Sequence, residues 1–461
     1  MRYECKALVL GGGITGLCAA HYLSEFFGRT RVLLLEAANA TGGAARTDIV
    51  DGFCLDWGPN GFLDREPLTL KWIDELGLSG ELVRADESAA RRFILKNNAL
   101  IEIRKPPAFL LSPLLSLSGR LRLMREPLVS RKRGNDPETV WSFAARRLGP
   151  EAADTLVSCM ASGVYGGDAK ELSMVDCFPR IAALEREYGS LLRGMFAKKR
   201  NSRAGDSMGP GGVLTSFRRG MGYLAEASSN TLGDRVLIAD AAQTIERIGS
   251  SYQIKTGQGH SINAEYVVVT IPAFRAAALL ASLDGEAATN LEAIPYAGIT
   301  VVCSAYTRQQ VDHPLGGFGY LVPKREGKRT LGCLWTSSIF PHEAPADHVL
   351  IRTMIGGATD PSALELDHEQ LMDVVRNEVH SLLRISGAPL LTQVFRHARG
   401  IPQYTLGHGG RLAAIEAAEN RNPGLVFAGN AYRGVGLNDC VVSAVRAVER
   451  VVFRDSTHAQ A

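Results

Sequence analysis

Three glycines and one acid near the N-terminus have the residue types and spacing of a dinucleotide-binding site. Gly11, Gly13 and Gly16 form a GxGxxG turn directly after an apolar run. The first glycine permits the tight turn, the second lets backbone approach a pyrophosphate, and the third lets the following helix lie close to the sheet. Glu36 follows Gly16 by 20 residues and ends a second apolar run, where its carboxylate would accept hydrogen bonds from ribose hydroxyls. We therefore expect a strand, a helix from about Ile14 whose N-terminus faces the pyrophosphate, and a second strand.

The loop after Glu36 separates two dinucleotide cofactors. It reads ANATGGAART, so a second glycine pair ends at Gly43 and Arg46 follows three residues later. A nicotinamide-binding domain usually continues directly into further strands and helices, whereas this loop can fold back over the same pyrophosphate. Arg46 would add a fixed positive charge there. The loop favours FAD over NAD, and the alternative is an ordinary glycine-rich turn with a surface arginine.

A second constellation lies near the C-terminus, in LVFAGNAYRGVGLNDCVVSAVRA at 425–447. We expect a buried strand that ends at Asn430, a turn in which Gly434 and Gly436 bring backbone close, and a helix from about Asn438. In a flavoprotein this position suits the ribitol and the N1–C2 edge of the ring, where reduction places negative charge. The alternative is a plain strand-to-helix turn.

Composition limits the class of protein. The chain has 461 residues, of which 46% are hydrophobic, so it can bury large cores in two or three domains. Its eight cysteines show no CxxC pair, which predicts reduced core residues in a cytosol-like compartment rather than a disulfide framework or a zinc site. The first strand begins so near Met1 that we expect no secretory or transit peptide. No stretch has 18 consecutive apolar residues, and the nearest candidate, 106–124, favours either a helix on a membrane surface or one packed on its own protein.

Charge is unevenly distributed along the chain. Residues 91–220 contain 23 Lys and Arg against 12 Asp and Glu, a local charge of +11 in a chain whose net charge is +3. The rest of the chain therefore carries −8. A basic segment favours an anionic substrate or an anionic membrane surface, and nucleic acid is disfavoured because no recognition module accompanies the charge.

The order of the expected elements predicts an α/β (α+β) fold. A Rossmann-like nucleotide-binding domain is built from discontinuous segments, and a mixed-sheet substrate domain and a helical domain are inserted into it. We expect two strands of a small sheet in 234–256 and a buried strand in 265–272, and a strand-rich stretch at 297–357 would supply the floor of a substrate cavity. The expected boundaries are 1–62, 213–275 and 410–461 for the FAD-binding domain, 90–205 for the helical, basic domain, and 63–89, 206–212 and 276–409 for the substrate-binding domain.

Beyond these patterns, the chain resembles the flavin-type protoporphyrinogen oxidase and coproporphyrinogen oxidase family, within the amine-oxidase-like FAD superfamily. The likeness spans nearly the whole length, and the GVYGGD, IPQYTLGH and GFGYLVP stretches are the most specific. The motifs that carry it are LDWGPNGF (55–62), ARRFILKNNAL (90–100), SGVYGGDAKELSMVDCFPRI (162–181), GGFGYLVP (316–323), TMIGG (353–357), IPQYTLGH (401–408) and GVGLNDCVVSA (434–444).

The resemblance implies two sets of site residues. Asn60 stands where some members of the family carry arginine, which puts a second cationic anchor for the substrate in doubt. For the cofactor, the turns predicted above and the family together give Gly11, Gly13, Ile14, Thr15, Gly16, Glu36, Ala37, Gly43, Arg46, Gly58, Pro59, Asn60, Gly61, Ala242, Gly429, Val435, Gly436 and Leu437. For the substrate, with Arg92 holding a propionate and the others lining an apolar slot, it gives Arg92, Gly163, Val164, Tyr165, Gly166, Gly167, Phe318, Gly319, Leu321 and Met354.

The implied reaction is the FAD-dependent oxidation of protoporphyrinogen IX to protoporphyrin IX in heme biosynthesis. Three two-electron hydride transfers to flavin N5, with O2 as terminal acceptor, would give H2O2. The chain contains no Ser-His-Asp spacing, paired carboxylates or HExxH motif, so we expect no side-chain nucleophile, no acid or base catalyst and no metal.

Several alternatives remain open from the sequence. The substrate alternative is coproporphyrinogen III, and more remote ones are another amine-oxidase-like FAD oxidase and a non-redox binding protein of the same fold. The expected partners are a porphyrinogen and O2, without nucleic acid. The expected location is the cytoplasm, with peripheral contact to the inner face of the cell membrane or to the next heme-pathway enzyme, and a homodimer is open.

Overall fold

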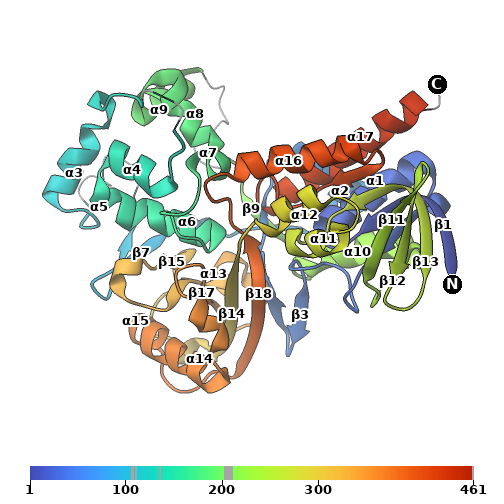
Figure 1. The fold of residues 1–461 in the computed structure, drawn as a ribbon. Coiled ribbons are helices and arrows are strands. Elements are labelled where there is room, and N and C mark those ends of the chain that lie inside the picture. The colour runs from blue at the N-terminus through green and yellow to red at the C-terminus, as the bar shows by residue number, and fades with distance from the viewer. Residues whose placement is uncertain (105–107, 109–111, 133, 135, 202–210, 459–461) are drawn as a thin grey trace.

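The structure is a computed structural model that describes residues 1–104, 108, 112–132, 134, 136–201 and 211–458. It has three regions (Figure 1). The first region is a sheet with helices on both faces, and it includes the first strand and the last helix of the chain. A second sheet packs beside it, and a helical lobe lies above the second sheet. This is the α/β fold of discontinuous segments that the sequence predicts.

The first sheet is mostly parallel and has seven strands. Its order is β10-β2-β1-β13-β12-β11, and β19 pairs with the end of β13. Four consecutive residues at the end of β1 are buried, which is typical of a parallel strand covered on both faces. The predicted strands at 32–35 and 425–427 both belong to this sheet. Its strands are β1 (Arg2–Leu10), β2 (Val32–Leu35), β10 (Val236–Leu237), β11 (Ala242–Ile248), β12 (Ser251–Thr256), β13 (Ser261–Val269) and β19 (Leu425–Phe427).

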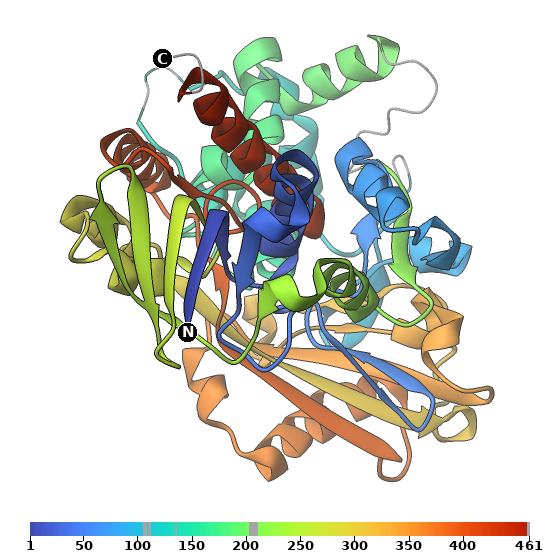
Figure 2. The ribbon, with the colours of Figure 1, turned by 90° about the vertical axis from the view of Figure 1, so that its right-hand side faces the viewer.

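Two hydrophobic cores cover the two faces of this sheet because side chains alternate along each strand. Ala7 and Val9 lie in a core with α1, α2, α10 and α17, whereas Leu8 and Leu10 lie in a core with α11, α12 and α16. The N-terminal helix α1 and the C-terminal helix α17 pack side by side (Figure 2). The helices are α1 (Ile14–Phe27), α2 (Pro67–Glu75), α10 (Gly222–Leu232), α11 (Ala273–Leu280), α12 (Gly285–Glu292), α16 (His408–Arg421) and α17 (Leu437–His458).

The second sheet also has seven strands, in the order β18-β14-β17-β16-β15-β7-β8. One face packs on α14 and its continuation, and the other packs on the hairpin of β3 (Thr47–Val50) and β4 (Phe53–Asp56). The members are β7 (Phe93–Lys96), β8 (Ala99–Glu102), β14 (Tyr296–Thr307), β15 (Gly319–Leu321), β16 (Thr330–Leu334), β17 (His348–Gly356) and β18 (Leu391–Pro402), with α13 (Thr336–Ile339), α14 (His368–Val375) and α15 (Ser381–Leu383) beside them.

Two segments pack with other sheets than the expected domain boundaries imply. Residues 93–102 form a hairpin that extends the second sheet, because β7 pairs in parallel with β15, so they are not part of the helical segment. The helices α2, α11 and α12 contribute to the cores of the first sheet rather than to the substrate side, since their apolar faces pack there. A small third sheet, of β5 (Phe62–Leu63), β9 (Leu214–Phe217) and β6 (Leu82–Arg84), lies between these regions.

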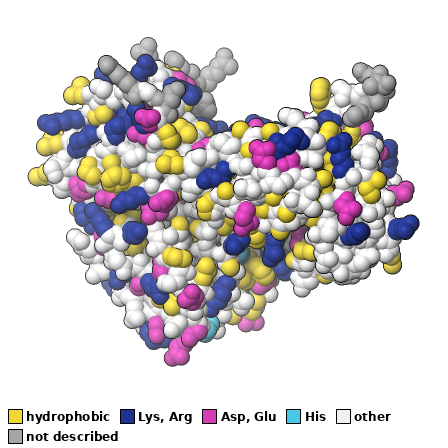
Figure 3. Space-filling view, in the orientation of Figure 1, with side chains coloured by type: hydrophobic (Ala, Val, Ile, Leu, Met, Phe, Trp, Pro, Cys, Tyr) yellow, Lys and Arg dark blue, Asp and Glu magenta, His cyan; other side chains and the backbone are white. Residues whose placement is uncertain are grey.

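The helical lobe is formed by the basic middle segment. A side chain caps α4 where Thr139 accepts a hydrogen bond from the Ser142 amide, and Ser116 caps α3 in the same way. Basic and apolar side chains lie side by side on the surface of this lobe (Figure 3). Of the stretch 106–124, residues 106, 107 and 109–111 lie outside the described residues. The helices are α3 (Leu117–Met124), α4 (Val140–Leu148), α5 (Pro150–Ala152), α6 (Ser158–Tyr165), α7 (Met174–Cys177), α8 (Pro179–Tyr188) and α9 (Leu191–Asn201).

Candidate active site

The glycine turn after β1 leaves room for an anion at the N-terminus of α1. A Cβ atom on Gly16 would lie 1.8 Å from the Gly11 carbonyl oxygen, so only glycine lets α1 approach the strand this closely. At Gly13 a Cβ would meet nothing within 4 Å. The helix begins at Ile14 without a side-chain cap and has no acidic residue in its first turn. Its free N–H groups and positive end therefore face open space, which fits a pyrophosphate.

The second glycine pair folds back onto this turn. The Gly42 amide donates to the Gly12 carbonyl oxygen over 2.7 Å, and a Cβ on Gly43 would lie 3.5 Å from the Gly13 Cα. Arg46, at the end of this loop, stacks its guanidinium 4.2 Å from the ring centre of Trp57. The structure thus places a cation beside the turn that the N-terminal glycines form.

Glu36 lies at the carboxyl end of β2, on the other side of the same turn. Its carboxylate accepts hydrogen bonds from the Gly12 amide at 2.6 Å and from the Ala38 amide at 2.7 Å. Its backbone carbonyl accepts from Asp240, two residues before Ala242 begins β11. Glu36, the exposed Ala37 and the approach to Ala242 therefore gather at one end of the site, where an adenosine would lie.

The C-terminal turn meets the N-terminal one at the same edge of the sheet. Since β1 and β19 are both parallel to β13, the helices that follow them, α1 and α17, begin at this edge. A Cβ on Gly429 would lie 3.9 Å from the Thr15 hydroxyl oxygen. The Gly436 amide donates to the Asp439 carboxylate just before α17 begins at Leu437, and Val435 packs against the helical lobe. Burial raises the pKa of Asp439.

The segment 57–61 crosses between the two sheets, and we call it the strap. A Cβ on Gly58 would lie 2.7 Å from the Ala44 carbonyl oxygen, and one on Gly61 would lie 2.8 Å from the Thr215 carbonyl oxygen. The Asn60 side-chain nitrogen is buried and has no hydrogen-bond partner in the described part of the chain. The two glycines let the strap pass close to other backbone. The unused Asn60 donor beside Pro59 suits a hydrogen bond to a polar ring system next to the strap.

Three residues that the resemblance assigns to the substrate converge on the second sheet. A Cβ on Gly163 would lie 3.1 Å from the Leu321 side chain, and one on Gly332 would meet both Leu321 and Met354, at 3.0 and 3.5 Å. Leu321 and Met354 are only half-buried, although most of their strand neighbours are buried. Half-buried apolar groups at a glycine cluster suit the wall of an apolar slot.

The GVYGGD segment is fastened to the rest of the protein at its end. The Gly166 carbonyl oxygen accepts from the Ala358 amide, and a Cβ on Gly167 would lie 2.5 Å from the Gln403 side chain. Val164 is exposed, whereas the Tyr165 side chain is buried in the helical lobe and donates to the Cys177 carbonyl oxygen. Tyr165 therefore lies away from Leu321 and Met354. Gly319 has a φ of 131°, and a Cβ there would clash with the Cys333 carbonyl oxygen. The pairing of β15 with β16 therefore explains why this residue is glycine.

Arg92 stacks over the ring of Phe318 at 5.1 Å and is exposed. Phe318 and Leu214 both pack on the small core of Ala89, Ile339 and Phe340. Leu214 pairs with Leu63 in the third sheet, and the Leu63 carbonyl oxygen accepts from the Asn438 side chain. The third sheet therefore connects Arg92 to the C-terminal turn. Among the described residues no carboxylate lies within ion-pair distance of Arg92, so its guanidinium can bind one from a ligand.

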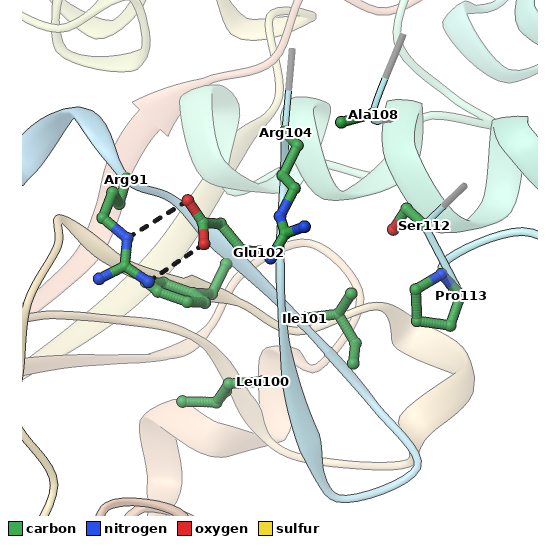
Figure 4. A pocket seen from close by; sticks show the side chains of 9 residues that line it. Arg91, Leu100, Ile101, Glu102, Arg104, Ala108, Ser112 and Pro113 are labelled. Carbon is green, nitrogen blue, oxygen red and sulfur yellow. Dashed lines mark hydrogen bonds and ion pairs between the residues drawn. The ribbon is translucent and has the colours of Figure 1, made fainter. Parts of the chain in front are cut away.

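Arg91 points to the other side of the β7–β8 hairpin. It makes two hydrogen bonds to Glu102, at 3.2 and 3.1 Å, on the wall of a cavity of about 430 Å³ (Figure 4). Glu102 neutralises Arg91, which leaves Arg92 as the arginine of the pair with no acidic partner among the residues described. The cavity is lined by Arg91, Phe93, Leu100, Ile101, Glu102, Arg104, Ala108, Ser112 and Pro113.

Two residues that the sequence analysis did not assign hold the strap. Arg352 donates to the Gly58 carbonyl oxygen over 2.8 Å, and the His397 ring nitrogen Nε2 lies 3.0 Å from the Trp57 carbonyl oxygen. Arg352 is the one charged side chain inside the strand His348–Gly356, in which every other residue from 349 to 356 is uncharged. An isolated charge in an apolar strand is the signal that would have drawn attention to it.

The described residues contain neither a cluster of His, Cys, Asp and Glu that could hold a metal ion nor a helix long and apolar enough to cross a membrane. All eight cysteines are free thiols. Burial raises the pKa of several, including Cys54 and Cys333, to about 12.

Comparisons with known proteins show which family and fold the chain resembles. Residues 14–452 match the model of the family described as flavin containing amine oxidoreductase. The chloroplastic protoporphyrinogen oxidase of Nicotiana tabacum is 32% identical over 97% of this chain and 85% of its own length, and the coproporphyrinogen III oxidase of Bacillus subtilis is 28% identical over 96% of both chains. A crystal structure from Exiguobacterium, provisionally assigned as a protoporphyrinogen oxidase, covers 97% of this chain and 99% of its own, with 27% identity and a TM-score of 0.85.

Proposed function

Because the chain belongs to the flavin containing amine oxidoreductase family, and is therefore an FAD-binding oxidoreductase, we propose that it oxidises a porphyrinogen. The proposed reaction is the conversion of protoporphyrinogen IX to protoporphyrin IX in heme biosynthesis. The observation that carries this proposal is a series of contacts. Arg92 stacks on Phe318, Phe318 packs on the same small core as the third sheet, and the third sheet bonds to the C-terminal turn. This connection supports a site in which Arg92, which has no acidic partner among the described residues, binds a carboxylate of the substrate and Phe318 forms part of an apolar wall.

The chain's own residues would bind and orient rather than transfer protons. When bound, FAD supplies a two-electron acceptor at N5 that O2 regenerates with release of H2O2, and three such rounds convert the porphyrinogen to the porphyrin. The uncapped N-terminus of α1 and Arg46 would hold the pyrophosphate, and Asn60 would donate a hydrogen bond beside the ring. Gly163, Leu321 and Met354 would exclude water from one face of the macrocycle.

The number of cations in the slot bears on the substrate. Protoporphyrinogen IX carries two propionates and coproporphyrinogen III carries four, so the latter needs more positive charge. Among the described residues, Arg91 is paired with Glu102 and Asn60 is uncharged, so of these three positions Arg92 is the one that offers a cation without an acidic partner. This favours the dicarboxylate.

A second candidate is the oxidation of coproporphyrinogen III to coproporphyrin III. Its support is the Bacillus subtilis relative of that name, whose full length this chain matches, and the charge of +11 in residues 91–220. Both candidates share the same flavin chemistry.

Porphyrin fluorescence with each substrate under air tests the proposal. We expect a yellow protein that forms porphyrin and H2O2, with a higher kcat/KM on protoporphyrinogen IX. A preference for coproporphyrinogen III would select the second candidate. A flavin-loaded protein that oxidises neither would favour another FAD oxidase, and a protein that cannot be loaded with FAD would favour a non-redox binding protein.

We also propose that the protein is cytoplasmic and that its helical lobe contacts an anionic membrane surface. Leu117 on α3, Leu128 in the following turn and Phe196 on α9 are 75%, 79% and 71% exposed, and the turn contacts both helices. The exposed Arg125 and Arg193 lie on the same elements. Apolar groups among arginines suit insertion at the level of anionic headgroups.

Co-sedimentation with vesicles tests this contact. We expect binding to phosphatidylglycerol vesicles, weaker binding to phosphatidylcholine, and loss of binding in a triple variant with Leu117, Leu128 and Phe196 replaced by serine. Native protein found wholly in the soluble fraction at low salt would contradict the proposal.

A further inference from the structure

Three charged side chains lie buried together beneath the strap. Asp56 precedes the strap on β4, Arg352 comes from β17, and Glu343 ends a short turn of 3-10 helix at 341–343. Each is at most 2% exposed. They are close enough for Asp56 and Arg352 both to act on the titration of Glu343, yet Arg352 lies within the 4.0 Å ion-pair distance of neither carboxylate.

The polar atoms of this trio are largely unused. Arg352 donates one hydrogen bond, from Nη2 to the Gly58 carbonyl oxygen, and its Nε and Nη1 have no partner in the described part of the chain. Both carboxyl oxygens of Glu343 and the Oδ2 atom of Asp56 are likewise buried without a described partner. Since orphaned donors and acceptors are rarely left so, the space among them is polar and suited to bound water.

The hydrogen bonds of the trio assign its charges. Burial raises the pKa of Asp56, but the Arg352 charge opposes this rise, and so do hydrogen bonds to its other oxygen from the Thr47 hydroxyl at 2.5 Å and the Met221 amide at 3.0 Å. These groups favour the charged form of Asp56 over that of Glu343. Glu343 has no such donors. Burial and the Asp56 carboxylate raise the pKa of Glu343 well above its ordinary value of 4.5. One carboxylate therefore balances Arg352, and Glu343 is neutral.

We propose that Arg352 is a positioning residue. It extends from the second sheet to fix the Gly58 carbonyl, and it supplies a buried positive charge beneath the strap. Asp56, neutral Glu343 and bound water hold its guanidinium in place. His397 fixes the adjacent carbonyl from another strand of the same sheet, so two consecutive peptide groups of the strap are held from the substrate side. The inference rests on the FAD-dependent function proposed above, because that function places the strap beside the flavin.

The chemical consequence concerns the charge of the bound flavin. Reduction adds negative charge to the ring, and a positive charge fixed nearby in a low-dielectric environment favours the reduced state. A displaced strap would also weaken retention of the cofactor. The effect on the potential depends on the positive charge, whereas retention of the cofactor depends on the planar guanidinium, which can hold the Gly58 carbonyl and bind further polar groups at once.

The test compares Arg352→Met with Arg396→Met as a matched control. Arg396 lies on β18, which is separated from β17 by β14 in the same sheet. It also donates to a backbone carbonyl, that of Leu366 at 2.7 Å, but it is exposed. We measure the flavin-to-protein ratio after gel filtration and the midpoint potential of the bound flavin. We expect Arg352→Met to lose flavin and to show a more negative potential, Arg352→Lys to recover part of that potential, and Arg396→Met to match the wild type.

Equal flavin content and potential in wild type, Arg352→Met and Arg396→Met would overturn the proposal, and so would a shift in potential that Arg352→Lys does not reduce. If Arg352→Met does not fold, Arg352→Lys alone is compared with Arg396→Met. We then expect faster flavin loss from the lysine variant, and equal retention would overturn the proposal. Neither readout uses a porphyrinogen, so the absence of porphyrin formation would count against the proposed function and leave this test intact.

Discussion

Two buried arginines, one in the helical lobe and one beneath the strap, differ in how completely they are paired. Arg147 donates to Glu126, to Glu185 and to the carbonyl oxygens of Val129 and Gly189, so all three of its nitrogens are used. Glu126 in turn accepts from the Ser190 hydroxyl and from two backbone amides. Arg352 uses one nitrogen of three. The difference indicates that the first cluster holds the lobe together, whereas the second has capacity left for water and for the site.

Arg147→Met gives the largest expected effect on stability. It leaves Glu126 buried without its ion-pair partner, which typically costs about 3–5 kcal/mol. Urea unfolding followed by far-UV circular dichroism measures the loss. The flavin potential is expected to stay at the wild-type value, since the lobe network does not touch the strap. A loss below about 1 kcal/mol, or a shifted potential, would break the distinction between the two clusters.

Sequence alone predicts the parts of the fold whose signal is local. The GxGxxG turn, Glu36 and the run LVFAGN each lie within a single strand–turn unit, and the structure has these strands and helices where they were expected. The hairpin 93–102 was misplaced because its partner β15 is more than 200 residues away. Pairing over such a distance depends on packing of whole domains, and no short pattern encodes it.

The contributions of Glu126 and Glu343 to the free energy of unfolding are expected to depend on pH in opposite directions. This effect is expected to be smaller than the loss of stability in Arg147→Met. Although burial raises it, hydrogen bonds from Ser190, Leu191 and Arg147 hold the pKa of Glu126 below its ordinary value of 4.5. Glu126 therefore stabilises the fold above the unfolded pKa, and this contribution is lost as the pH falls through the folded pKa. Glu343 has a raised pKa, so its contribution is present at low pH and is lost as the pH rises through the folded value.

Paired unfolding experiments from about pH 3 to pH 8 measure this contrast. Glu343→Gln keeps the neutral shape and the hydrogen-bonding capacity, so its stability relative to the wild type is expected to rise with pH. Glu126→Gln is expected to be less stable than the wild type at neutral pH, because it removes a charge that Arg147 requires, and this difference is expected to shrink as the pH falls through the folded pKa of Glu126. A Glu343→Gln variant that becomes relatively less stable as the pH rises would show that Glu343 is ionised beside Asp56 and Arg352.

The site was predictable from the sequence only in part, and Arg352 shows why. Gly16 is diagnostic by type, since a Cβ at that position would lie 1.8 Å from the Gly11 carbonyl oxygen. Arg352, Trp57 and His397 act through contacts between the strap and the second sheet, and neither strand reveals its partner. Similarly, the family pattern includes Tyr165 as a residue of the slot, whereas the structure buries its side chain among the helices of the lobe. Side-chain direction depends on packing and not on the motif.

Arg92→Ala gives the smallest expected effect on stability and extends the comparison to an arginine with no acidic partner among the described residues. Its exposed guanidinium rests on Phe318, so its loss is expected to leave the free energy of unfolding within about 0.5 kcal/mol of the wild type. If it holds a propionate, KM is expected to rise about tenfold, the equivalent of one charged hydrogen bond, with kcat and flavin content unchanged. Arg91→Ala is the matched control. Because the Arg91 guanidinium is already paired with the Glu102 carboxylate, KM is expected to change little in this variant. An equal rise in KM for both variants would mean that general positive charge, rather than a carboxylate anchor at Arg92, attracts the substrate, and loss of flavin from Arg92→Ala would make the residue structural.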